Sequence, residues 1–115
     1  MTGTMTPNGI LVRQGDSFDI AMRFKHKDGS VMDISGANIY LDVKDQDETT
    51  VLHIAGDIID AGNGQALIKI TPQHSRLAVG SYEANIKIIF ASGNVHTVFP
   101  QDISQNAIFQ ITEGV

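Results

Sequence analysis

Four histidines are the side chains in this sequence best suited to bind a metal ion or to act as a general base. They are His26, His53, His74 and His96. Local metal sites usually place two ligands two or four residues apart, so that one face of a strand or helix presents both. No two of these histidines have that spacing. We therefore expect no metal site and no catalytic histidine, and we expect His53 and His96 to be solvent-facing strand residues.

The acidic run at 45–48 (Asp-Gln-Asp-Glu) begins like a calcium-binding loop. An EF-hand loop that starts there would need glycine at its sixth position and glutamate at its twelfth. Thr50 and Gly56 stand at those two positions instead. We expect a solvated loop, and only a looser calcium site at the edge of a sandwich stays open as an alternative.

Nucleophilic catalysis lacks its usual motifs. The sequence contains no cysteine and no G-x-S-x-G motif. The glycines of the segment 62–64 (Gly-Asn-Gly) do not lie between a strand and a helix, so they favour a hairpin turn over a phosphate-binding loop. We therefore predict that the protein is not an enzyme and holds no cofactor, although a hydrolase with two facing carboxylates remains a third class to test.

Sugar-binding surfaces depend on exposed aromatic faces, and this sequence offers few of them. It has no tryptophan, two tyrosines and five phenylalanines. The strand patterns described below place Phe18, Phe24, Phe90 and Tyr82 inward and Tyr40 outward. A carbohydrate-binding module is therefore disfavoured but kept as an alternative.

The composition and charge of the chain argue against some classes of binding partner. The chain has 115 residues and a formal net charge of −5, from 13 acidic and 8 basic residues. That balance argues against nucleic acid, which needs a clustered positive surface, and against an anionic membrane surface. The longest apolar run, at 86–91, is interrupted by Lys87 and is too short to span a bilayer.

Short segments of alternating apolar and polar residues, separated by turn signals, run along the chain from Ile10 onward. Alternation with a period of two predicts half-buried strands. Turn signals such as Asp-Gly at 28–29 recur at the spacing typical of antiparallel sandwiches and barrels. The expected strands are 10–14, 18–25, 37–44, 51–55, 65–71, 81–90, 95–99 and 107–112, with a short extended piece at 31–33 and at most two helical turns at 71–77.

The resulting fold prediction is an all-β protein, an immunoglobulin-like Greek-key antiparallel β-sandwich of seven or eight strands. We expect one such domain over residues 10–115, preceded by a flexible N-terminal arm over residues 1–9. The arm holds little that could be buried, so its deletion should leave the fold intact. The first and last strands are the expected sheet edges.

Leu77, Gly80 and Tyr82 stand immediately before the most regular strand pattern. This spacing is typical of a tyrosine corner, in which the tyrosine ring packs at the edge of the core and its hydroxyl bonds to the backbone. The alternative is that Tyr82 belongs to a ligand-binding platform. We favour the structural role because the corner accounts for the spacing.

The motifs also resemble a known family when they are taken in order. They are residues 13–20 (RQGDSFDI), 27–37 (KDGSVMDISGA), an Ala-Gly-Asn-Gly turn at 61–64, Thr-Pro at 71–72, the segment 77–82 and a Gly-Asn hairpin at 93–94. Together they resemble the N-terminal domain of phage baseplate upper proteins and related Ig-like domains of phage and prophage tails. The likeness extends over about residues 10–112.

This resemblance implies a non-enzymatic structural component of a phage or prophage tail or baseplate, acting as an assembly or attachment module. It implies a place in the virion tail after synthesis in the bacterial host cytoplasm, with other tail and baseplate proteins as partners. A trimeric or hexameric homo-oligomer is compatible with it. Family members usually carry further domains, and this sequence ends at Val115, so the receptor-binding role of those domains is not carried over. The alternative function is a bacterial Ig-like adhesion module or a carbohydrate-binding module.

Overall fold

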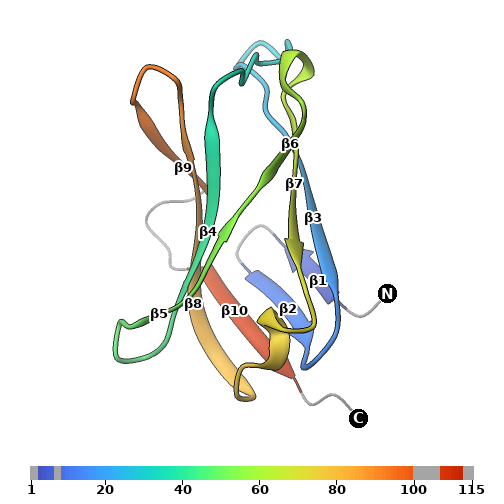
Figure 1. The fold of residues 1–115 in the computed structure, drawn as a ribbon, viewed down its shortest axis with the longest axis vertical. Coiled ribbons are helices and arrows are strands. Elements are labelled where there is room, and N and C mark those ends of the chain that lie inside the picture. The colour runs from blue at the N-terminus through green and yellow to red at the C-terminus, as the bar shows by residue number, and fades with distance from the viewer. Residues whose placement is uncertain (1–2, 7–8, 100–106, 113–115) are drawn as a thin grey trace.

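The structure is a computed structural model that describes residues 3–6, 9–99 and 107–112. These residues form ten strands and two single-turn 3-10 helices (Figure 1). The strands are β1 (Gly3–Thr6), β2 (Gly9–Arg13), β3 (Phe18–Arg23), β4 (Asn38–Lys44), β5 (Thr50–Ala55), β6 (Asp57–Asp60), β7 (Gln65–Ile70), β8 (Gly80–Ile89), β9 (Val95–Phe99) and β10 (Ala107–Thr112). The helices are η1 (Ala61–Asn63) and η2 (His74–Arg76). None of the described helices has the length and apolar character that crossing a bilayer requires.

The strands form two sheets that pack face to face. The larger sheet has the order β1-β2-β10-β8-β4-β5, and β9 pairs with β8 outside this order. The smaller sheet has the order β3-β7-β6. In immunoglobulin domains, strands B, E and D lie together in one sheet, and strands G, F and C in the other. Here β3-β7-β6 follows the first pattern, and β10-β8-β4 follows the second. The chain therefore folds as an Ig-like Greek-key β-sandwich, as the sequence predicted.

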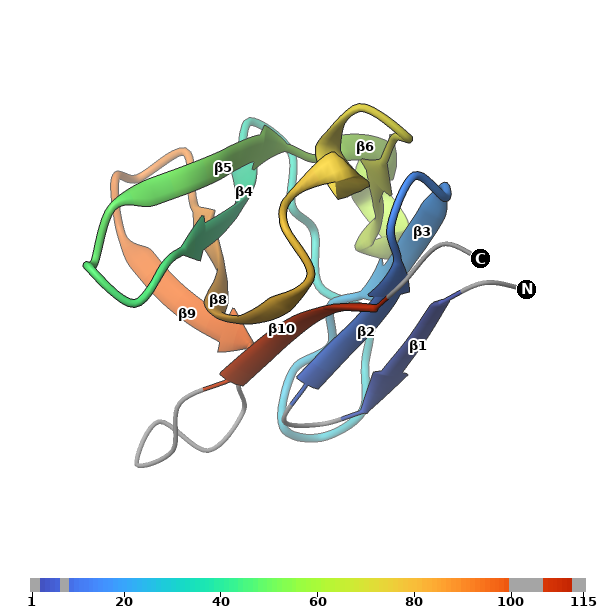
Figure 2. The ribbon, with the colours of Figure 1, turned by 90° about the horizontal axis from the view of Figure 1, so that it is seen from below.

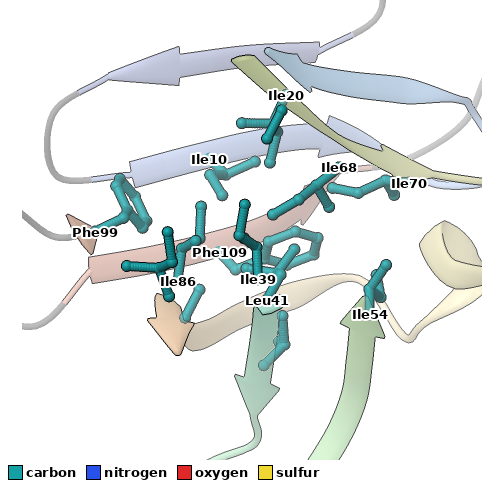
Figure 3. Close-up of a cluster of buried hydrophobic side chains, with 14 of the residues drawn as sticks. Ile10, Ile20, Ile39, Leu41, Ile54, Ile68, Ile70, Ile86, Phe99 and Phe109 are labelled. Atoms are coloured by element: carbon teal, nitrogen blue, oxygen red, sulfur yellow. The ribbon is translucent and has the colours of Figure 1, made fainter. Parts of the chain in front are cut away.

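The core lies between the two sheets and is made almost entirely of aliphatic side chains. Figure 3 shows side chains from both sheets meeting there, with the Phe109 ring among them. Alternation accounts for this in β4, where Ile39, Leu41 and Val43 are each at most 1% exposed while the residues between them face outward. Burying one such side chain contributes about 1.5–3 kcal/mol. Because β7, β8 and β10 show the same alternation, the interior was predictable from the sequence.

The N-terminal segment differs from the expected flexible arm. Residues Gly3–Thr6 form β1, which pairs antiparallel with β2 from Gly3 opposite Val12 to Thr6 opposite Gly9. Backbone pairing needs no apolar side chain, and this short segment contains two threonines, which have a high strand propensity. The composition of residues 1–9 therefore gave no indication of this strand.

Three further features of the sheets correct the sequence prediction. Strand β10 lies inside the larger sheet, between β2 and β8, so the last strand is not an edge (Figure 2). It pairs with β2 in parallel, and the sandwich is therefore not antiparallel throughout. Strand β6 was not expected at all. The short extended piece expected at 31–33 forms one isolated bridge, Val31 with Lys25.

Candidate functional site

The residues of the expected tyrosine corner lie at the start of β8. The Tyr82 hydroxyl donates a hydrogen bond of 2.7 Å to the carbonyl oxygen of Ala78, four residues upstream. Leu77 and Tyr82 are half-buried against the core. Gly80 has φ of 154°, which L side chains rarely adopt. This geometry gives Tyr82 a structural role, because its hydroxyl is held by backbone.

The same corner is bonded to the turn between β2 and β3. Ser75, fully buried in η2, donates from its hydroxyl to the carbonyl oxygen of Asp16 at 2.7 Å. The backbone N–H of Gly15 donates to the carbonyl oxygen of Ser75 at 3.2 Å, and Gln14 Nε2 donates to the carbonyl oxygen of Leu77 at 3.0 Å. These bonds satisfy polar groups that would otherwise be costly to bury. The expected helical turn at 71–77 is confirmed as η2.

The four histidines lie in four separate parts of the chain. His26 follows β3, His53 is in β5, His74 begins η2 and His96 is in β9. The nitrogen Nδ1 of His74 accepts a hydrogen bond of 3.1 Å from the backbone N–H of Thr71, and the His96 ring meets the Phe90 ring edge-on at 5.3 Å. In the described part of the chain, no three histidine or acidic side chains are close enough to hold a metal ion.

A small polar cluster occupies the outer face of β4 and β5. The His53 side chain is 59% exposed, and its Nδ1 pairs with Asp42 Oδ1. Its ring stacks on Tyr40, with 4.7 Å between ring centroids and 17° between ring planes. Tyr40 does face outward, as the sequence predicted, but the His53 ring covers one face of it. The cluster therefore leaves Tyr40 little room to act as a sugar platform.

The acidic run at 45–48 forms a tight turn between β4 and β5. Asp45 Oδ1 accepts hydrogen bonds from the backbone N–H groups of Asp47 and Thr49, at 2.9 and 3.0 Å. Glu48 has φ of 62°, the one positive value among described residues other than glycine. The Asp45 carboxylate thus holds the loop together, which is the ordinary use of aspartate in turns.

A shallow hollow lies beside this loop on the outer side of the larger sheet. It is lined by the apolar side chain of Ile108 and by residues that include Tyr82 and the carboxylates Asp45, Glu48 and Glu83. Among the described residues, no lysine or arginine forms an ion pair with these carboxylates, but Lys44 lies opposite Glu83 in the ladder between β4 and β8. Three carboxylates and one neighbouring lysine therefore surround the hollow.

The connection from β3 to β4 contains two matching aspartate turns. Asp28 accepts from the Ser30 hydroxyl at 2.6 Å and from the Ser30 backbone N–H at 2.9 Å, and Asp33 does the same with Ser35. The serine hydroxyl is the main cause, and the backbone N–H the second, of a pKa below the usual value for each aspartate. These serines and aspartates lie in the motif at 27–37, so a local hydrogen-bond pattern accounts for its spacing.

Two apolar side chains are diagonal neighbours on the outer face of the larger sheet. Leu11 of β2 is 41% exposed and Ile108 of β10 is 51% exposed. Leu11 lies opposite Gln110 in the parallel ladder between β2 and β10. Ile108 comes two residues before Gln110, so it lies on the same face of the sheet, diagonal to Leu11. The sequence analysis considered only the inward residues of these strands and missed this pair.

Strand β5 ends the larger sheet, at the opposite end from β1 (Figure 2). It pairs with β4 on one side, and no described strand pairs with its other side. Its sequence, Thr-Val-Leu-His-Ile-Ala, contains no charged residue, proline or glycine. Charged residues and proline are two of the features that protect natural edge strands, and β5 has neither. Its one irregularity is a register shift against β4 between Val43 and Lys44, at the start of the strand, so the segment from Leu52 to Ala55 is a regular open edge. The sequence analysis identified the strand but could not show that it lies at an edge.

Comparison with known proteins identifies no family for this chain. No protein-family model matches the chain, and no curated protein matches it. Among solved structures, it is similar to murine CRIg, with a TM-score of 0.40 and 10% sequence identity over 97% of this chain and 96% of that chain. The strand order and register described above, and not this likeness, support the Ig-like assignment.

Proposed function

We propose that this protein is a non-enzymatic structural component of a phage or prophage tail or baseplate, where it acts as an assembly or attachment module. The ordered motifs over residues 10–112 support the proposal through their resemblance to tail proteins. The observation that carries it in the structure is the exposed apolar pair, Leu11 and Ile108, on the outer face of a rigid sheet. Apolar side chains grouped at a surface mark sites of protein association more often than isolated ones do.

The test is the protein content of purified tail particles. In the bacterial strain that carries the gene, tail particles are induced and purified, and their proteins are identified by mass spectrometry. We expect this protein in the particles together with other tail and baseplate proteins. Its absence from them would refute the proposal.

A double variant tests the apolar pair itself. Leu11→Ser with Ile108→Ser should lower the amount of protein incorporated into particles, because the contact surface loses its apolar area. The matched control is Ile59→Ser, which changes a side chain that is 61% exposed on β6 of the other sheet. Equal incorporation of the double variant and the control would argue against this face as the contact.

Solution measurements separate this proposal from the adhesion or carbohydrate-binding alternative. Size-exclusion chromatography with light scattering reports whether the chain forms a trimer or hexamer, the states that favour a virion part. A glycan array reports whether it binds sugars. Selective glycan binding by a monomer that is absent from tail particles would replace the assembly role with the alternative.

A further inference from the structure

We propose that β5 is a docking edge that takes up an extended, positively charged segment of a partner protein as an additional antiparallel strand. An unpaired edge offers a row of backbone donors and acceptors, and an incoming strand can satisfy them. The inference deepens the proposed function, because the partner would be another tail protein. It depends on that function only for the source of the segment.

The backbone geometry shows which groups are available. The N–H of Gly56 donates to the carbonyl oxygen of Ile39 at 2.7 Å, so these two residues form a hydrogen-bonded pair. The register continues with Ala55 opposite Tyr40, Ile54 opposite Leu41 and His53 opposite Asp42. Hydrogen-bonded pairs alternate with non-bonded pairs in an antiparallel ladder. The backbone groups of His53 and Ala55 therefore point away from β4, toward the open edge.

The charge around β5 specifies the kind of segment. The strand itself contains no lysine, arginine or carboxylate. The loop before it carries three carboxylates, Asp45, Asp47 and Glu48, against the one lysine, Lys44, that lies opposite Thr50, and Asp57 follows two residues after the end of the strand. A bound strand would lie between these two acidic ends. Lysine or arginine at both ends of the segment would then lie next to carboxylates, whereas acidic residues would be repelled.

The same charges disfavour a second copy of this chain as the occupant. In an antiparallel pair of β5 strands, the acidic loop at 45–48 of one copy would lie close to Asp57 of the other. A net charge of −5 on each chain adds to the repulsion. The flanking carboxylates thus disfavour pairing of β5 with a second copy of the chain, whereas a basic strand can still pair with this edge.

Strand β9 provides an internal comparison. It is also uncharged and has no described strand on its outer side, but the turn before it, Ser-Gly-Asn at 92–94, carries no charge. An extended segment that needs only a free edge would bind β9 and β5 equally. A segment that also needs acidic residues at both ends of the strand would bind β5.

The experiment uses the full chain and two short synthetic peptides of alternating threonine and valine, one with two lysines at each end and one with two glutamates. Binding is measured by calorimetry, and the bound strand is located by amide shifts and hydrogen exchange in NMR spectra. We expect the lysine peptide to bind about tenfold more tightly than the glutamate peptide at low salt. The amides of His53 and Ala55 should become protected from exchange.

Two variant pairs test the edge and its charges separately. Ala55→Pro removes an edge-facing N–H and should abolish binding, whereas Thr97→Pro on β9 should leave it intact. Neutralising the ends with Asp47→Asn and Asp57→Asn should remove the preference for lysine. Each of the two substitutions is also made alone, and Asp19→Asn, which neutralises one exposed carboxylate on β3, is the control for the single variants and should preserve the preference.

Three results would overturn the inference. They are equal binding of both peptides, amide shifts away from β5, and protection of β5 on dimerisation of the chain without peptide. The outcome for the tail-protein proposal is separate, because it depends on particle content. Particles that contain the protein, with a β5 edge that binds neither peptide, would retain the function and remove this docking mode.

Discussion

At the scale of single residues, several of the polar side chains that could take part in binding or catalysis are instead hydrogen-bonded to the backbone in the described part of the chain. Tyr82, Ser75 and Asp45 each bond to main-chain atoms at a corner or turn. Such bonds commit a polar group to the fold and leave it less available to a ligand. The polar residues that the sequence analysis singled out at these positions therefore stabilise the corner and the turns.

The Tyr82 hydroxyl should contribute measurably to stability. Tyr82→Phe keeps the ring against the core but removes the donor to Ala78, and we expect a loss of about 1 kcal/mol in the free energy of unfolding. Tyr40→Phe is the control, because it removes the other tyrosine hydroxyl in the chain and keeps its ring on His53. Urea denaturation measures both. Equal losses would show that the corner bond contributes nothing specific.

The two aspartate turns predict a dependence on pH. Asp33 has a pKa below the usual 3.8, so the stability it contributes is present above that value and is lost as pH falls through the lower folded-state pKa. Ser35→Ala removes the main cause and should raise the pKa of Asp33 toward 3.8 while leaving the pKa of Asp28 low. Titration of the carboxyl carbons by NMR measures both groups in one sample. An unchanged Asp33 curve would contradict the assignment.

At the scale of elements, sequence alternation predicted β4, β7 and β8 because one face of each strand is buried. The same signal could not predict β6 (Asp57–Asp60), whose residues are exposed or half-buried. It also could not show that β5 is an edge, since edge position depends on which strands pair and not on local pattern. Elements specified by burial were therefore found, and elements specified by backbone pairing were missed.

The turn through η1 depends on one glycine. Gly64 has φ of 66°, and a Cβ there would lie 2.6 Å from the carbonyl oxygens of both Met32 and Phe24. Gly64→Ala should cost at least about 1–3 kcal/mol from the backbone conformation alone, with the overlaps adding to it. Thermal or urea unfolding measures this change.

The control for that variant lies in the same turn. A Cβ on Gly62 would meet one atom at 4.0 Å, Oδ1 of Asp60. Gly62→Ala should therefore change the free energy of unfolding by no more than about 0.5 kcal/mol. If both alanine variants lost the same stability, close approach at Gly64 would not be the reason for its glycine.

At the scale of the whole molecule, the larger sheet is assembled from segments at opposite ends of the chain. Strand β10 pairs in parallel with β2 and antiparallel with β8, so the last strand connects the N-terminal strands to the rest of the sheet. Long-range pairing of this kind leaves no mark in local sequence. The strand at 107–112 was nevertheless expected, because the alternation that places Phe109 and Ile111 on one buried face is local.

Removing residues 1–8 tests how much of the sheet depends on β1. Strand β2 also pairs with β10, and its side chains Ile10 and Val12, which are 2% and 0% exposed in the whole chain, are core residues. The lost ladder bonds contribute about 1 kcal/mol each, but ordering each residue of β1 costs about 1–2 kcal/mol. These contributions nearly cancel, so we expect the truncated chain to fold with a similar urea midpoint.

The same truncation should change how the edge behaves. Without β1, the outer backbone groups of β2 are exposed, so hydrogen exchange at the β2 amides that face β1 should accelerate. The amides of β8 in the middle of the sheet serve as the control and should stay protected. Global unfolding of the truncated chain would show that β1 is part of the cooperative core, whereas unchanged exchange in β2 would show that β1 does not pair in solution.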